Sequence, residues 1–164
     1  MRCCEPDEGV GGTVKRILIG AGAGALATVP QSLVVWGLKA AGLYRRPPPP
    51  ATVAAGVSAA AAVDLQALPE EQRRAVTLAA HFAFCAAGGA AFGLATGVVR
   101  PTPVAGLLAG LAIWKASYDG WIPAMRILPP PATDESGRVL TMVLAHVAYG
   151  LTLGALVDRW PRRS

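Results

Sequence analysis

The sequence has little charge of either sign. Only 15 lysines and arginines and 10 aspartates and glutamates occur among 164 residues, which makes 15% of the chain charged and leaves 53% hydrophobic. Ordinary soluble domains carry about 25% charged residues, and the mean hydropathy here is +0.44. So few charges argue against a disordered chain, a nucleic-acid binder and a conventional soluble enzyme. They favour a single membrane domain over residues 1–164.

The sequence also has few of the side chains that bind metals or perform catalysis. It contains two histidines and three cysteines, and Cys3, Cys4 and Cys85 form neither a disulfide framework nor a Cys-x-x-Cys pair. The glycine-rich residues 20–24 resemble a dinucleotide loop, but they lie within a long apolar stretch and follow no predicted strand. We therefore expect no cofactor and no resident metal, and we find no catalytic motif.

Long uncharged stretches divide the chain. Residues 17–38, 75–99 and 139–157 are uncharged runs of 22, 25 and 19 residues, and a helix needs about 20 residues to cross a bilayer. A fourth apolar window, 104–122, contains only two charged residues, Lys115 and Asp119. The sequence thus predicts an all-α fold, an integral membrane four-helix bundle. A soluble bundle would instead alternate polar and apolar faces at helical period, which these segments do not.

The remaining segments hold the other 23 charges. They are an N-terminal tail at 1–16, a Pro/Ala-rich loop at 39–74, a short connection at 100–103 that holds Arg100, a second loop at 123–138 and a basic C-terminal tail at 158–164. The N-terminal segment carries three acidic residues and a long apolar run, so we expect a retained first span and no secretory signal. Neither loop has enough apolar residues to form a separate soluble core.

Aromatic residues near the span ends are typical of a membrane interface. Trp36, Tyr44, Trp121 and Trp160 hold these positions. The distribution of lysine and arginine leaves the orientation open, because seven fall on each side of the predicted membrane. We expect both termini to be cytoplasmic, since Cys3 and Cys4 are adjacent and best kept as thiols in a reducing compartment.

Every predicted span contains a Gly-x-x-x-Gly pair, which places two glycines on one helix face and lets helices approach closely in lipid. The pairs are Gly20 and Gly24, Gly89 and Gly93, Gly106 and Gly110, and Gly150 and Gly154. We expect packing within one chain, and a homo-oligomeric contact is the alternative. The second and fourth spans also align at an offset of 65, which pairs His81 with His146. This similarity predicts two tandem helical hairpins forming a parallel repeat.

The polar residues of the spans share a similar depth. At a rise of 1.5 Å per residue, four of them lie about 10 to 12 Å from the side with the two long loops, and Asp119 lies about 6 Å deep. Polar groups at this depth usually face the bundle interior or a wet cavity. The candidate intramembrane polar site therefore comprises His81, His146, Lys115, Asp119, Gln31 and Tyr118.

Three interpretations of this layer remain open. The first is a structural hydrogen-bonding network that joins the four helices. The second is a binding or conduction site in which the histidines carry protons or metal ions, although neither histidine belongs to a local metal-binding pair. The third is an intramembrane enzyme with Ser117 or Cys85 as the nucleophile, which no spacing requires. We expect membrane lipids as partners and no nucleic acid.

The chain also resembles a known family in three features: the paired histidine segments, residues 121–123 and residues 128–130. From about Lys15 to Arg159, the chain resembles small bacterial multi-pass membrane proteins of unknown function of the YagU-like kind. This resemblance implies a bacterial inner-membrane location and assigns no activity to particular residues. The sequence thus predicts a multi-pass membrane protein with a non-enzymatic role. A small transporter or channel-like protein for protons or ions is the alternative.

Overall fold

The structure, a computed structural model, describes residues 8–61 and 64–160. This part of the chain is helical and contains no strand. The elements are α1 (Glu8–Ala40), α2 (Pro49–Ala60), the 3-10 turn η1 (Leu65–Ala67), α3 (Glu70–Ala95), α4 (Pro103–Ala116), the π-helical turn η2 (Ser117–Trp121), α5 (Ile122–Ala124) and α6 (Ser136–Asp158). Cys3, Cys4, Arg162 and Arg163 lie outside the described residues.

Three helices are long and apolar enough to cross a membrane. They are Gly9–Ala40, Glu70–Ala95 and Ser136–Asp158. The fourth predicted window, 104–122, differs, because its α-helix ends at Ala116 and continues as the π-helical turn η2. Pro123 follows this turn. A proline has no backbone N–H and its ring clashes with the carbonyl four residues earlier, so the preceding turn cannot remain a regular α-helix.

The short connection between α3 and α4 has local causes. Thr102 accepts a hydrogen bond from the backbone N–H of Ala105 at 3.1 Å, and Pro103 occupies the first turn of α4. Both features favour a helix start. At the other end of the molecule, α1 ends at Ala40, and Gly42 follows with a φ of +77°, a conformation that glycine adopts at little cost.

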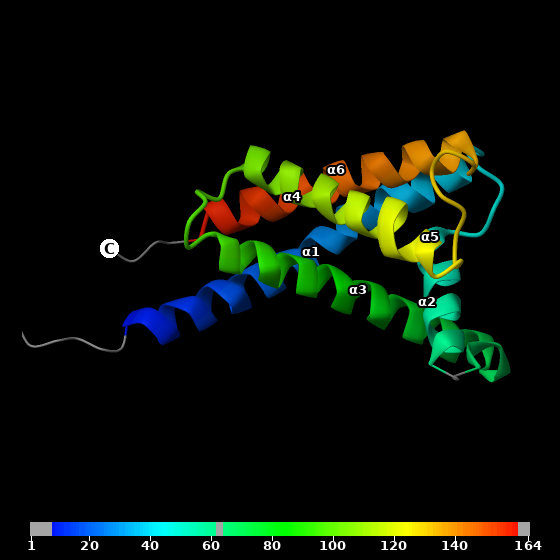
Figure 1. The fold of residues 1–164 in the computed structure, drawn as a ribbon, viewed down its shortest axis with the longest axis horizontal. Coiled ribbons are helices and arrows are strands. Elements are labelled where there is room, and N and C mark those ends of the chain that lie inside the picture. Colours follow the sequence, from blue (N-terminus) through cyan, green and yellow to red (C-terminus); the bar gives the residue numbers. More distant parts are fainter. Residues whose placement is uncertain (1–7, 62–63, 161–164) are drawn as a thin grey trace, which may run out of the picture.

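The long helices associate in a defined order: α1 packs against α3, α4 packs against α6, and α1 also contacts α6. Figure 1 shows the start of α1, the end of α6 and the α3–α4 connection at one end of the molecule, with α2 and α5 at the other. We call the latter the long-loop end. It is also where α1 and α3 diverge in this view, and α2 lies beside the start of α3 (Figure 1).

The glycine pairs lie at the two main helix contacts. A Cβ atom built on Gly20 would lie 2.8 Å from the Cα of Gly93, and one on Gly24 would lie 2.9 Å from the Cα of Gly89. A real Cβ does not tolerate such distances, so only glycine permits this approach of α1 to α3. The contact is the close packing that small residues allow between helices.

The same arrangement recurs between α4 and α6. A Cβ on Gly106 would lie 2.6 Å from the Cα of Gly154, and one on Gly110 would lie 2.9 Å from the Cα of Gly150. If the two contacts are superimposed, Gly89 of α3 corresponds to Gly150 of α6, at an offset of 61 residues. At the same offset, Cys85 corresponds to His146. The histidine-based offset of 65 therefore differs from the packing register by four residues, about one helical turn.

Buried side chains form two clusters. One lies around the α1–α3 and α1–α6 contacts and contains Ala23, Ala27, Cys85, Phe92, Tyr149, Leu153 and Val157. The second lies near the long-loop end and contains Tyr118, Ile122, Leu128 and Met142. The second cluster joins η2 and the following loop to α6, and it forms one side of the candidate site described below.

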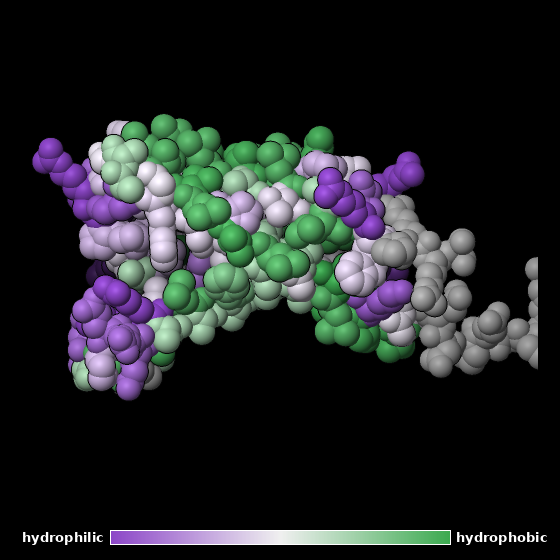
Figure 2. Space-filling model, turned by 180° about the vertical axis from the view of Figure 1, so that it is seen from behind, coloured by the Kyte–Doolittle hydropathy of each residue, from purple (hydrophilic) through white to green (hydrophobic). Residues whose placement is uncertain are grey.

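The outer surface is unusually apolar. Large hydrophobic side chains along α1 and α4 are exposed, including Leu18, Leu26, Leu33, Val104 and Leu108. Seen from behind the view of Figure 1, the molecule carries hydrophobic residues over its middle and hydrophilic residues gathered at both ends (Figure 2). A monomer in water rarely exposes so much contiguous apolar surface. The surface is compatible with a membrane location.

Candidate functional site

A cavity of about 290 Å³ lies near the long-loop end, between α1, α2, α3, η2 and α6. We call it the histidine cavity, because both histidines of the chain line it. Four of the six residues of the predicted polar site contribute to its lining: Gln31, His81, Tyr118 and His146. The other lining side chains are mostly apolar, and none is Asp, Glu, Lys or Arg.

Two of these polar residues are held by neighbouring groups. Gln31 is buried, and its amide oxygen accepts a hydrogen bond from the Cys85 thiol at 3.2 Å. His146 is also buried, and its Nδ1 lies 2.8 Å from the carbonyl oxygen of Met142. Because a carbonyl only accepts, Nδ1 carries the proton and Nε2 of the neutral imidazole is left as an acceptor.

His81 differs from His146 in its surroundings. Its side chain is half-buried, and its Nε2 atom is buried without a hydrogen-bond partner among the described residues. A buried polar atom without a partner costs about 1 to 3 kcal/mol, and such an atom calls for an explanation such as an unseen bound group. In the histidine cavity, the imidazole of His81 therefore offers a hydrogen-bonding position for a ligand.

Tyr118 connects the cavity to a buried ion pair that sequence reasoning missed. Its hydroxyl donates a hydrogen bond to the Asp134 carboxylate. The same carboxylate accepts hydrogen bonds from Nε of Arg138 at 2.8 Å and from Nη2 at 2.5 Å. The side chains of Asp134 and Arg138 are 0% and 2% exposed. The sequence interpretation counted both among the loop charges. An Asp four residues before an Arg at a helix start was the available signal.

Asp134 stays ionised because several donors surround it. Burial by itself raises the pKa of a carboxyl group, but hydrogen bonds from Arg138, Tyr118 and the backbone N–H of Glu135 outweigh this effect and lower the pKa of Asp134. The Glu135 carboxylate accepts the backbone N–H of Arg45 at 3.0 Å. These contacts fasten the segment after α1 to the beginning of α6, beside the cavity.

The remaining two residues of the predicted site lie elsewhere. Lys115 and Asp119 form an ion pair with each other, with side chains 70% and 30% exposed, and neither lines the histidine cavity. They occupy an outer face of α4 and η2. The shared depth of the six residues therefore does not bring all six together, because helix rotation separates this pair from the other four.

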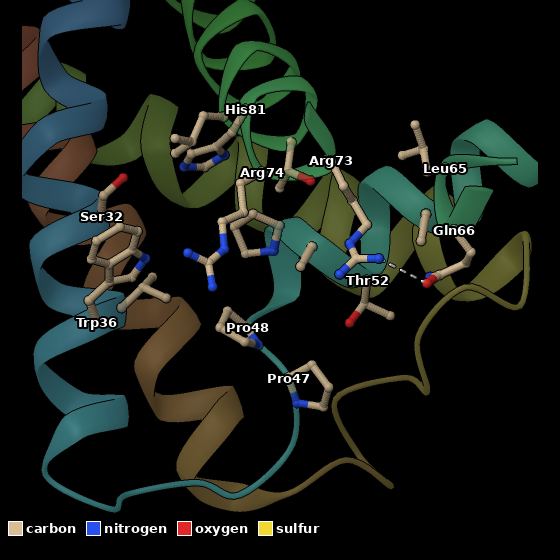
Figure 3. Close-up of a pocket in the computed structure, with 16 residues that line it drawn as sticks. Ser32, Trp36, Pro47, Pro48, Thr52, Leu65, Gln66, Arg73, Arg74 and His81 are labelled. Atoms are coloured by element: carbon tan, nitrogen blue, oxygen red, sulfur yellow. Dashed lines mark hydrogen bonds between the residues drawn. The ribbon is translucent and has the colours of Figure 1, made fainter. Parts of the chain in front are cut away.

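A second, wider cavity of about 660 Å³ adjoins the first, and three residues line both: Pro50, Thr77 and His81. We call it the arginine cavity, because Arg73 and Arg74 line it and no acidic residue does. Figure 3 shows the Arg74 side chain between Trp36 and Pro48, and Arg73 reaching towards Gln66. Arg74 also pairs with Glu70, whereas Nη1 of Arg73 donates to the neutral amide oxygen of Gln66 at 3.5 Å.

The arrangement of the site is compatible with binding a small molecule. Among residues 8–61 and 64–160, no group of three His, Cys, Asp or Glu side chains is arranged to hold a metal ion. The two candidate nucleophiles are directed to other partners, because the Ser117 hydroxyl donates to the carbonyl of Ile113 at 2.6 Å and the Cys85 thiol donates to Gln31. Apolar walls with a few polar groups are typical of small-molecule sites.

Comparisons with known proteins identify no relative. No family model, no curated protein and no solved structure matches this chain. The YagU-like resemblance therefore remains a prediction from the sequence, and the site must be interpreted from its own geometry.

Proposed function

We propose that this chain is a four-span integral membrane protein that binds a small, largely apolar molecule without converting it chemically. The observation that carries the proposal is the histidine cavity, where apolar walls surround polar groups from α1, α3, η2 and α6. Its volume of about 290 Å³ lies just below the usual range for ligand pockets, roughly 300 to 1,000 Å³. Membrane lipids supply abundant molecules of this kind.

The four spans of the proposal are α1, α3, α6 and the α4–η2 segment as an interrupted helix. The recurring glycine contact supports two tandem hairpins, α1 with α3 and α4 with α6, in one parallel repeat. In a bilayer, the interrupted backbone at η2 is tolerated because the cavity and the second buried cluster adjoin it. The proposal includes a bacterial inner-membrane location with both termini cytoplasmic.

Labelling of single cysteines tests whether α3 crosses the membrane, as the four-span topology requires. Val98, in the α3–α4 connection, is 92% exposed, and Ala61 at the end of α2 is also exposed. In a chain whose other cysteines are replaced by serine, Val98→Cys and Ala61→Cys should react with an impermeant maleimide from opposite sides of the membrane. Reaction of both from the same side would contradict the four-span arrangement.

Photolabelling tests the cavity as a binding site. The probe is a long-chain alcohol with a diazirine in its tail, added to the protein in lipid nanodiscs. We expect the label on residues that line the histidine cavity. Ala80→Phe should reduce the label because Ala80 lines the cavity, whereas Ala79→Phe is the matched control, since Ala79 is also exposed on α3 but lines no part of it. Label found solely on lipid-facing residues outside the cavity would refute the binding function.

Proton handling is the second candidate. The observation that favours it is that both imidazoles line one cavity. Nε2 of His81 has no hydrogen-bond partner among the described residues, and Nε2 of His146 can accept a proton because Nδ1 carries the proton of that ring. Histidines of this kind can relay protons near neutral pH. Liposomes that contain the protein should then dissipate a pH gradient, and His81→Ala or His146→Ala should abolish the flux. No flux above that of protein-free liposomes would eliminate this candidate.

A further inference from the structure

We propose that the ligand of this site is an anionic amphiphile, with one hydrocarbon chain in the histidine cavity and its charged head group in the arginine cavity. The inference rests on the proposed binding function and specifies its ligand. The two cavities are adjacent and share Pro50, Thr77 and His81. One molecule can therefore occupy both.

The histidine cavity suits the hydrocarbon chain. Its rim includes Val57, Val76 and Phe84, which are 41%, 40% and 45% exposed, so apolar side chains border the opening between α2 and α3. A lipid chain can enter there from the bilayer without crossing a polar surface. A volume of about 290 Å³ corresponds to roughly ten water volumes. This space accommodates part of one hydrocarbon chain.

The arginine cavity suits an anionic head group. Glu70 neutralises Arg74 in part, but Arg73 has no acidic partner among the described residues and no acidic residue lines the cavity. The local charge is therefore positive. Arginine binds carboxylates and phosphates through two parallel hydrogen bonds, and these bonds are about twice as strong as neutral ones.

The shared residue His81 completes the arrangement. Its buried Nε2 has no partner in the described protein, and it lies where the hydrocarbon part and the head group of the ligand would meet. A neutral imidazole can hydrogen-bond to a head-group oxygen or hydroxyl. Trp36 is 61% exposed and lines the arginine cavity together with His81 (Figure 3), so it adds an aromatic ring of the kind found at membrane interfaces. An amphiphile therefore leaves fewer groups unpaired than a purely apolar ligand.

The experiment compares two diazirine probes of equal chain length, a fatty acid and the corresponding alcohol, with the full-length protein in nanodiscs. We expect both probes to label the histidine cavity and the fatty acid to bind more tightly. Arg73→Gln should weaken fatty-acid labelling about tenfold, since a hydrogen bond to a charged group is lost. Alcohol labelling should fall much less, because a hydroxyl accepts a weaker hydrogen bond than a carboxylate does, and Arg73→Lys should restore part of the effect. Arg45→Gln is the matched control, because Arg45 is exposed at the same end and lines neither cavity.

The outcomes separate the two proposals. If the acid and the alcohol label the cavity equally and Arg73→Gln affects neither, the anionic head group is wrong while the binding function stands. If neither probe labels the cavity, both proposals fail. Competition distinguishes two sources of the same chemistry, since excess unlabelled fatty acid and vesicles of phosphatidylglycerol offer a carboxylate and a phosphate head group respectively. Displacement by either one supports the inference, and displacement by neither contradicts it.

Discussion

Gly24 of α1 and Gly89 of α3 lie in direct backbone contact. A Cβ atom on Gly24 would lie 2.9 Å from the Cα of Gly89, and a Cβ on Gly89 would lie 2.7 Å from the Cα of Gly24. Because this contact holds the two helices together towards the middle of the molecule, α1 and α3 can separate towards the long-loop end, where α2 lies beside α3. The cavities occupy that separation. The glycine contact and the candidate site are thus parts of one arrangement.

A side chain at this contact should destabilise the protein. We expect Gly24→Val to lower the free energy of unfolding by at least about 1 to 3 kcal/mol, because backbone atoms of α3 cannot shift as easily as a flexible side chain. Gly22→Val is the control, since a Cβ on Gly22 meets nothing within 4 Å. Unfolding of both variants in detergent or bicelles measures the difference. Equal stability of the two variants would show that the contact does not hold the helices.

Sequence reasoning predicted the helices and their glycines better than their partners. Uncharged length predicts where helices lie, and a Gly-x-x-x-Gly pair predicts that a helix face packs closely. Neither property states which helix faces which. The pairing of Gly24 with Gly89, and of Gly110 with Gly150, therefore emerged from the structure. The predicted alignment of the two hairpins also differs from the packing register by about one helical turn, because it was based on the two histidines and the helices pack through their glycines.

The outer position of Lys115 and Asp119 leads to a second prediction. These residues form an exposed pair and line no part of the histidine cavity. An exposed pair of this kind contributes about 0 to 1 kcal/mol, so Lys115→Gln should change stability little and leave probe labelling at the cavity unchanged. His81→Ala, in contrast, should weaken labelling by both probes. Parallel photolabelling of the two variants measures this. A loss of cavity labelling in Lys115→Gln would show that Lys115 contributes to the binding site.

Depth and rotation explain why four predicted site residues converge and two do not. The depth of Lys115 follows from counting residues along a helix, as it does for His146. The face of the helix cannot be counted in the same way, because α4 is apolar all round except for Lys115 and no polar stripe marks its inner side. The Asp134–Arg138 pair was missed for a related reason, since charges beside a span normally indicate the interface and not a buried contact.

The buried pair itself should matter for stability. Asp134→Asn leaves the guanidinium of Arg138, which is 2% exposed, without its charged partner. Removal of one member of a buried ion pair costs about 3 to 5 kcal/mol, and we expect a loss of this order in the free energy of unfolding. Arg45→Gln serves as a charge-changing control at the same end, because its side chain is exposed. Chemical unfolding monitored by tryptophan fluorescence measures both variants.

The same pair predicts an acid dependence. The pKa of Asp134 is lower in the folded protein than its ordinary value of about 3.9. Its contribution to stability is therefore complete at pH values above that ordinary pKa and disappears as the pH falls through the lower folded pKa. Wild-type stability should decrease in this range more than that of Asp134→Asn. Identical acid profiles for the two proteins would contradict the ionised state of the buried carboxylate.

Two tyrosines provide the sharpest comparison. Tyr118 donates to the ionised Asp134, whereas Tyr149 donates at 2.6 Å to the neutral carbonyl of Cys85, and both rings are almost completely buried. Tyr118→Phe should cost about 1.5 to 3 kcal/mol and Tyr149→Phe about 0.5 to 1.5 kcal/mol, because a bond to a charged acceptor is stronger. Tyr118→Phe should also raise the pKa of Asp134 towards its ordinary value and move the acid-dependent loss of stability to higher pH. Tyr149→Phe should leave that pH unchanged. Unfolding curves across the acid range measure both effects, and an equal shift in the two variants would show that the Tyr118 hydroxyl does not act through Asp134.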